Sequence, residues 1–175
     1  AETCDYADIH AYWQHPRFPG RPWDPVNWTI ANTPMEAAPA ADVLLSRAPW
    51  RLTDRPFTLS EWNIPDPNDY AASVVPFAAM VAALQDWDGV FFFQYHSSSD
   101  GWDSDRVQRY FSFNGQPVKL ALFTACANLY RRNDLPPLPQ VRAAALGQLL
   151  PATTAMSYRI GIDPTRSETQ TDTTS

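Results

Sequence analysis

A single carboxylate, Glu61, follows an apolar stretch that has the spacing of a β-strand. Phe57, Leu59 and Glu61 recur at period two, so the pattern predicts that they share one face of a strand. A carboxylate at a strand end either meets water or an ion pair, or acts as a nucleophile that forms a covalent intermediate. A nucleophilic carboxylate must stay ionised, and hydrogen-bond donors around it favour the charged form.

Two candidate donors, His10 and Tyr12, lie with Asp8 at period two on an earlier predicted strand. Neighbouring parallel strands lie about 4.8 Å apart. If these two strands are neighbours, Tyr12 should donate its phenol hydrogen to Glu61 near the rim of the sheet, and His10 should lie one layer deeper. The alternative is that the backbone satisfies His10 and that Tyr12 packs under the loop that follows it.

Aromatic and amide side chains gather in or beside the predicted loops, where they suit the flat apolar faces of sugar rings. The candidate substrate-binding residues are Trp13, Trp62, Asn63, Gln94, Tyr95, His96 and Trp102. Trp23 and Trp28 belong to the same aromatic set. The alternative for these rings is packing beneath long loops, which is the common fate of large aromatic residues.

Several classes of function are disfavoured. The net charge is −6 and there is no basic patch, so we expect no nucleic-acid partner. No apolar run is long enough to span a membrane. The three histidines lack zinc-like spacing, and the acidic loop with Asp100, Asp103 and Asp105 lacks the glycine and distal glutamate of an EF-hand, so no metal and no cofactor are expected.

The elements that must position these residues alternate between strand and helix. Strands are predicted near residues 6–12, 57–62 and 90–95, with helices near 35–48, 71–85 and 117–132, and with a kink at Pro76. This order predicts an α/β fold with parallel strands and right-handed crossovers, and the helices should cover one side. The sheet would have open edges and an exposed apolar inner face, so this piece should be poorly soluble or should associate.

The chain divides near Asp134, where the helical pattern ends and prolines follow. Residues 1–134 are predicted to form part of a barrel domain. Residues 135–175 are predicted to be a linker, a possible start of a β domain and a tail. Within this second part, 140–150 reads as a short helix or a first strand, and 165–175 lacks core residues and is predicted to be disordered.

These motifs resemble those of clan A glycoside hydrolases, the retaining (β/α)8-barrel enzymes that include cellulases and mannanases. Ser60-Glu61-Trp62-Asn63 resembles the nucleophile motif of their seventh strand, and Asp8-Ile9-His10-Ala11-Tyr12 resembles the His-x-Tyr of an earlier strand. Residues 89–96 resemble the eighth strand and 117–132 the final helix. The resemblance covers roughly residues 5–134 and implies the C-terminal part of a TIM barrel, about three β/α units corresponding to strands six to eight.

The resemblance implies a hydrolase of β-glycosidic bonds that acts with retention, with Glu61 as nucleophile, His10 and Tyr12 in support and an oligo- or polysaccharide as substrate. The clan's acid/base glutamate follows an asparagine, and this sequence has no Asn-Glu pair. The missing N-terminal half of the barrel is therefore an expected partner, and the chain alone should be inactive. A non-catalytic carbohydrate-binding barrel and a purely structural domain are the alternatives. Substrate, compartment and oligomeric state stay open, with an extracytoplasmic or secreted location favoured.

Overall fold

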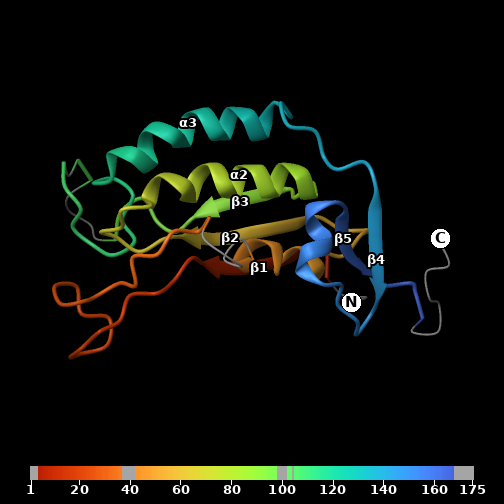
Figure 1. Cartoon of the computed structure of the whole chain (residues 1–175), viewed down its shortest axis with the longest axis horizontal. Helices are drawn as coiled ribbons and strands as arrows, with labels where there is room; N and C mark the ends of the chain where they lie inside the picture. The colour runs from red at the N-terminus through yellow and green to blue at the C-terminus, as the bar shows by residue number, and fades with distance from the viewer. Residues whose placement is uncertain (1–3, 37–41, 98–101, 104, 168–175) are drawn as a thin grey trace.

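Three parallel strands form the central sheet. The computed structural model describes residues 4–36, 42–97, 102–103 and 105–167. The strands β1 (Ala7–Tyr12), β2 (Phe57–Asn63) and β3 (Gly89–Phe92) pair in parallel in the order β1-β2-β3 (Figure 1). The predicted parallel pairing is thereby confirmed, although β3 ends three residues earlier than expected.

Two helices lie on the same side of this sheet, as expected (Figure 1). They are α2 (Val74–Gln85), preceded by the 3-10 turn η3 (Ala71–Ser73), and α3 (Pro117–Arg131). Pro76 falls in the first turn of α2, where helical N–H groups have no intrahelical acceptor, so the predicted kink is wrong.

The first predicted helix, 35–48, is also wrong in extent. Among the described residues only α1 (Asp42–Leu45) and the 3-10 turn η2 (Ala48–Trp50) are helical here, and residues 37–41 lie outside the description. Pro49 enters the first turn of η2, a position that proline tolerates.

The apolar side of β2 faces the helices. Phe57, Leu59 and Trp62 are fully buried and belong to one hydrophobic cluster with the buried residues of α2. The Trp62 indole Nε1 donates a hydrogen bond to the Val74 carbonyl oxygen at 2.8 Å. Trp62 therefore fixes the start of α2 against the strand.

An irregularity in β2 moves Glu61 to the other side of the sheet. The β1–β2 register shifts between Ile9 and His10, so that His10 is opposite Glu61. Ser60 and Glu61 both project toward the face opposite Phe57 and Leu59, as the hydrogen bonds to Asp8 and Tyr12 show. The prediction that Phe57, Leu59 and Glu61 share a face is wrong, because a β-bulge interrupts the period-two alternation.

The face that holds Glu61 is mostly polar. Asp8 accepts hydrogen bonds from Ser60 Oγ at 2.5 Å and from the Thr58 hydroxyl. His10 is exposed on this face, and Phe91 is its large exposed hydrophobic residue on β3. The expectation of an apolar inner face is therefore wrong for β1 and β2, because Asp8, Thr58 and Ser60 place polar side chains on it.

A second, two-stranded parallel sheet closes the end where β1 to β3 begin (Figure 1). It consists of β4 (Val141–Ala145) and β5 (Arg159–Asp163), with the 3-10 turn η4 (Ala152–Met156) between them. Of the two readings for 140–150, strand is the one observed. The predicted disordered tail, 165–175, lies mostly outside the described residues.

The C-terminal sheet shares the core of the first. Ile160 is fully buried in the same hydrophobic cluster as Phe57. Gln85, at the end of α2, donates through Nε2 to the carbonyl oxygens of Ala155 (2.7 Å) and Tyr158 (2.8 Å) and accepts from Ile160 N (3.0 Å). Residues after 134 are therefore packed onto the first part rather than tethered to it.

None of the helices in the described part of the chain has the length and apolar character that crossing a membrane requires.

Candidate functional site

A cavity of about 380 Å³ opens beyond the carboxyl ends of the three parallel strands. Ligand sites in parallel α/β folds commonly lie at this edge. Its lining residues come from β1, β2 and the loops that follow β1 and β3: Tyr12, His15, Trp23, Glu61, Phe93, Gln94, Ser97, Arg109, Tyr110 and Phe111. Residues as distant in sequence as Tyr12 and Phe111 thus meet at one place.

Glu61 is held on one oxygen by two side chains of β1. The Tyr12 hydroxyl donates to Glu61 Oε2 at 2.5 Å, and His10 Nδ1 lies 3.4 Å from the same oxygen. The predicted contact between Tyr12 and Glu61 is therefore confirmed. The prediction that His10 lies one layer deeper is wrong, because the register shift brings His10 level with Glu61.

The electrostatics around Glu61 keep Tyr12 protonated, so that it can donate to the Glu61 carboxylate. Burial of Tyr12, with the hydrogen bond to Glu61 and the negative charge of Glu61, raises the pKa of the phenol well above its usual 10.0. Burial works to raise the pKa of Asp8, but hydrogen bonds from Ser60 and Thr58 and the proximity of His10 outweigh it, so the pKa lies below its usual 3.8. Tyr12 thus remains a donor over the neutral range.

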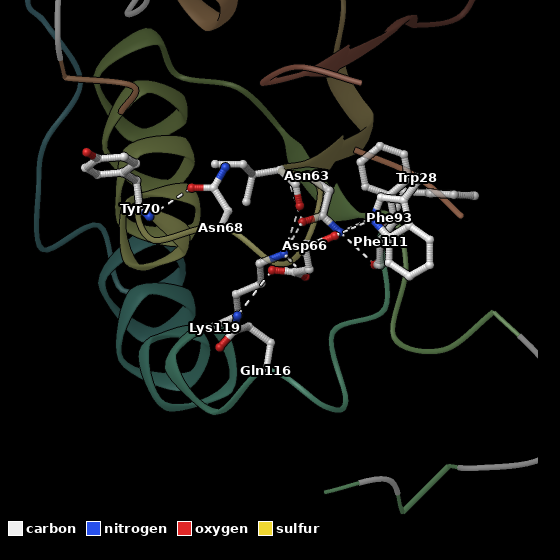
Figure 2. Close-up of polar contacts among 10 residues, drawn as sticks. Trp28, Asn63, Asp66, Asn68, Tyr70, Phe93, Phe111, Gln116 and Lys119 are labelled. Atoms are coloured by element: carbon white, nitrogen blue, oxygen red, sulfur yellow. Dashed lines mark hydrogen bonds and ion pairs between the residues drawn. The ribbon is translucent and has the colours of Figure 1, made fainter. Parts of the chain in front are cut away.

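A buried ion pair supports the strand end behind the cavity (Figure 2). Lys119 and Asp66 are both fully buried, and Lys119 Nζ donates to Asp66 Oδ2 at 2.7 Å, to Asn63 Oδ1 at 3.0 Å and to the Ile64 carbonyl oxygen at 2.9 Å. Burial raises the pKa of Asp66 against the opposing effect of Lys119, and burial lowers the pKa of Lys119. The three hydrogen bonds that the Lys119 ammonium donates use its full hydrogen-bonding capacity at a site shielded from water.

Asn63 and Asp66 connect this ion pair to the cavity walls (Figure 2). Asn63 Nδ2 donates to the carbonyl oxygens of Phe93 (2.5 Å) and Phe111 (2.9 Å), and the Trp28 indole donates to the Asp66 carbonyl oxygen at 2.8 Å. The two loops that surround the cavity, those after β1 and after β3, are therefore fixed to residues that follow Glu61 in the chain.

An aromatic wall closes one side of the cavity. Tyr110 packs against four rings, those of Phe18, Trp23, Trp28 and Phe111, with centroid separations of 5.4, 6.2, 5.6 and 5.5 Å. Trp23 remains 61% exposed, so its ring presents an apolar surface to solvent at the cavity. Stacking on sugar rings is what such a surface suits.

Among the predicted substrate-binding residues, Gln94 lines the cavity. Trp62 and Asn63 do not: both are fully buried, Trp62 in the core and Asn63 in the network around Lys119. Their predicted contact with substrate is wrong, because the bulge in β2 turns Trp62 toward the helices. Trp13 packs against the core and donates to the Thr33 carbonyl oxygen at 2.8 Å, which matches the alternative of packing beneath a loop.

The last three predicted residues lie outside the cavity lining. The rings of Tyr95 and Trp102 stack on each other with centroids 5.5 Å apart, and both are about half exposed. His96 is buried, with Nδ1 3.2 Å from Asn114 Oδ1. An aromatic pair is therefore present after β3, but the structure separates it from Glu61's cavity.

Sequence reasoning missed His15, Phe93, Ser97, Arg109, Tyr110 and Phe111 as lining residues. The signal available for 109–111 was weak: a basic residue and two aromatic residues in a polar loop. His15 packs its ring 4.7 Å from that of Tyr12, a contact that depends on the turn after β1.

In the described part of the chain, no three His, Cys, Asp or Glu side chains are grouped as a metal site requires. Asp100, one member of the acidic loop considered for calcium, lies outside the described residues.

Comparison with protein-family models, curated proteins and solved structures gave no match to this chain. Its function must therefore be argued from the geometry around Glu61.

Proposed function

We propose that the cavity beside Glu61 is part of the active site of a retaining β-glycosidase, with Glu61 as the nucleophile. The observation that supports this most is the 2.5 Å hydrogen bond from Tyr12 to Glu61 Oε2 within a cavity at the carboxyl edge of the sheet. Tyr12 and His10 both approach Oε2, which leaves Oε1 without a hydrogen bond from the described residues. Oε1 is then the attacking oxygen.

The proposed reaction has two displacements. Glu61 Oε1 attacks the anomeric carbon and forms a glycosyl ester as the glycosidic bond breaks, while a second carboxylic acid gives its proton to the leaving oxygen. That second group, now a carboxylate, takes a proton from water. The water attacks the same carbon and releases Glu61. Tyr12 orients the carboxylate and stabilises its negative charge before attack and after release.

The second carboxylic acid is supplied from elsewhere in this proposal. Of the described residues that line the cavity, Glu61 is the one carboxylate. Retention requires the two carboxyl groups to lie about 5–5.5 Å apart. The acid/base residue therefore belongs to polypeptide that the described residues do not include, and those residues alone should not turn over substrate.

The same proposal assigns the sheet to a (β/α)8 barrel. The parallel order, the polar face that holds Glu61 and the helices on the opposite face are what three consecutive β/α units of a barrel require. Both β1 and β3 are edge strands, so further strands can pair with either side. The remaining barrel strands would bring the acid/base residue opposite Glu61.

A mechanism-based fluoroglycoside tests the assignment. Incubated with the full-length protein, it should form a stable ester on the peptide that contains Glu61, as identified by peptide mass spectrometry. The Glu61→Gln protein should stay unlabelled. A label on another residue, with Glu61 unmodified, overturns the proposal.

That Glu61 is the one carboxylate among the described lining residues favours one alternative, a carbohydrate-binding barrel without catalysis. That function requires the aromatic wall but not Glu61. Saccharide binding that is equal in wild type and in the Glu61→Gln protein, with no turnover of any β-glycoside, would identify it.

A further inference from the structure

Arg109 is a charged residue of the cavity that the proposed reaction does not use. It is the one arginine or lysine among the described lining residues, and it is half-buried there. Within the described ranges, none of the salt bridges involves its guanidinium. The acidic side chains of β1 and β2 already have hydrogen-bond partners: Glu61 accepts from Tyr12, and Asp8 accepts from Ser60.

The backbone that presents Arg109 is fixed. The next residue, Tyr110, accepts a hydrogen bond from Asp66 N at 2.7 Å. Phe111 accepts one from Asn63 Nδ2 at 2.9 Å and one from Gln94 N at 3.2 Å. Two successive carbonyl groups are thus bound to the buried network around Lys119. A fixed backbone reduces the entropy that is lost on binding, so the backbone that carries Arg109 is in place before any ligand arrives.

The charge balance of the cavity indicates what Arg109 binds. The negative charge of Glu61 would by itself repel an anionic ligand. The positive charge of Arg109, in the same lining, offsets it. Guanidinium groups bind carboxylates and sulfates through two parallel hydrogen bonds. His15, also in the lining, offers a further ring nitrogen on the same side as Tyr12. The aromatic wall provides the apolar surface for a sugar ring.

We propose that the cavity binds a saccharide bearing an anionic group, either a uronate carboxylate or a sulfate ester, and that Arg109 is the partner of that group. The inference rests on the proposed function, since it requires the cavity to bind a glycoside. It makes Arg109 the residue that selects charged over neutral substrates, while Glu61 and Tyr12 are responsible for the reaction at the anomeric carbon.

The test measures binding apart from turnover. Calorimetric titration of the full-length protein carrying Glu61→Gln uses β-linked oligosaccharides of the gluco, manno and galacto series, each in neutral, uronate and sulfated form. One anionic member should bind about tenfold to a hundredfold more tightly than its neutral counterpart. Arg109→Gln in the same background should abolish this preference, and added salt should weaken it.

Two further variants sharpen the result. Arg109→Lys keeps the charge but loses the paired donors, so its preference should be intermediate. Arg21→Gln removes the same charge from an exposed position outside the lining and should leave the preference unchanged. Comparing the affinities of the uronate and sulfated saccharides identifies which anion the cavity binds.

Equal binding of neutral and anionic members, a preference that survives Arg109→Gln, or no binding of any anionic member overturns the inference. Fluoroglycoside labelling of Glu61 reports on the proposed function independently. A labelled Glu61 with no anionic preference rejects the role of Arg109 alone.

Discussion

Tyr12 and Glu61 meet because an extra residue in β2 places both side chains on one face of the sheet. A strictly alternating β2 would have directed Glu61 toward α2, into a region where Phe57 and Leu59 are fully buried. An unpaired carboxylate there would be costly, so the bulge keeps Glu61 out of the apolar core and beside Tyr12.

With Glu61 as the proposed nucleophile, replacing Tyr12 by phenylalanine should slow formation of the proposed glycosyl ester about tenfold to a hundredfold, because a hydrogen bond to a charged group is lost. The rate is measured as release of the leaving group in the first turnover by the full-length protein. Tyr130→Phe is the matched control, since Tyr130 donates to the Trp87 carbonyl oxygen outside the cavity. An unchanged rate with Tyr12→Phe would show that the hydrogen bond has no catalytic role.

The raised pKa of Tyr12 has a pH signature. A group whose pKa is higher in the folded state contributes stability that is fully present below its unfolded pKa, here 10.0, and that is lost as the pH rises through the folded pKa. The stability difference between wild type and Tyr12→Phe should therefore be constant from neutral pH to about 10. Difference absorbance of the phenolate between the two proteins should place the titration of Tyr12 above 10.0. Half-ionisation at or below that value would contradict the partly buried hydrogen bond between Tyr12 and Glu61.

At the scale of elements, the ion pair of Lys119 and Asp66 joins α3 to the end of β2. Removing one partner of a buried ion pair leaves an uncompensated charge in the interior. Asp66 also binds Gln116 Nε2 at 3.2 Å and the Trp28 indole through its carbonyl oxygen, so its position affects α3 and the long loop together.

Lys119→Met should lower the free energy of unfolding by about 3–5 kcal/mol, as measured by denaturant titration at neutral pH. The charge is the cause, so adding Asp66→Asn to the Lys119→Met protein should restore part of the loss. A change below about 1 kcal/mol, within the range of exposed pairs, would mean that water reaches the site.

At the scale of the whole molecule, the two ends of the central sheet differ: one carries the cavity, and the other is covered by a second sheet. The loops after the strands form the cavity, and the sheet of β4 and β5 covers the opposite end (Figure 1). Asp86, at the end of α2, accepts from Arg159 Nη1 at 2.6 Å and reinforces the contacts of Gln85. The C-terminal segment therefore stabilises the sheet without touching the candidate site.

Gln85→Ala should release this segment, because three hydrogen bonds are lost at a fully buried position. We expect a loss of at least about 2 kcal/mol in unfolding free energy and faster proteolytic cleavage between residues 135 and 163. Gln148→Ala, at an exposed position, is the control. Unchanged proteolysis in the Gln85→Ala protein would show that the apolar contacts of Ile160 suffice.

The sequence by itself determined the parallel direction of the three strands and the helix 117–131. It also predicted the contact between Tyr12 and Glu61, but that contact forms only because of the bulge in β2. Strand and helix periodicity are local, and the carboxyl ends of parallel strands share one edge, so the strands and the helix follow from short segments. Only the tertiary structure decided the face of Glu61, the burial of Trp62 and the place of Arg109 in the cavity. A bulge depends on the neighbouring strand, and a loop residue reaches a cavity only through contacts with distant segments. The spacing of nearby residues therefore predicts neither the bulge nor the position of the loop residue.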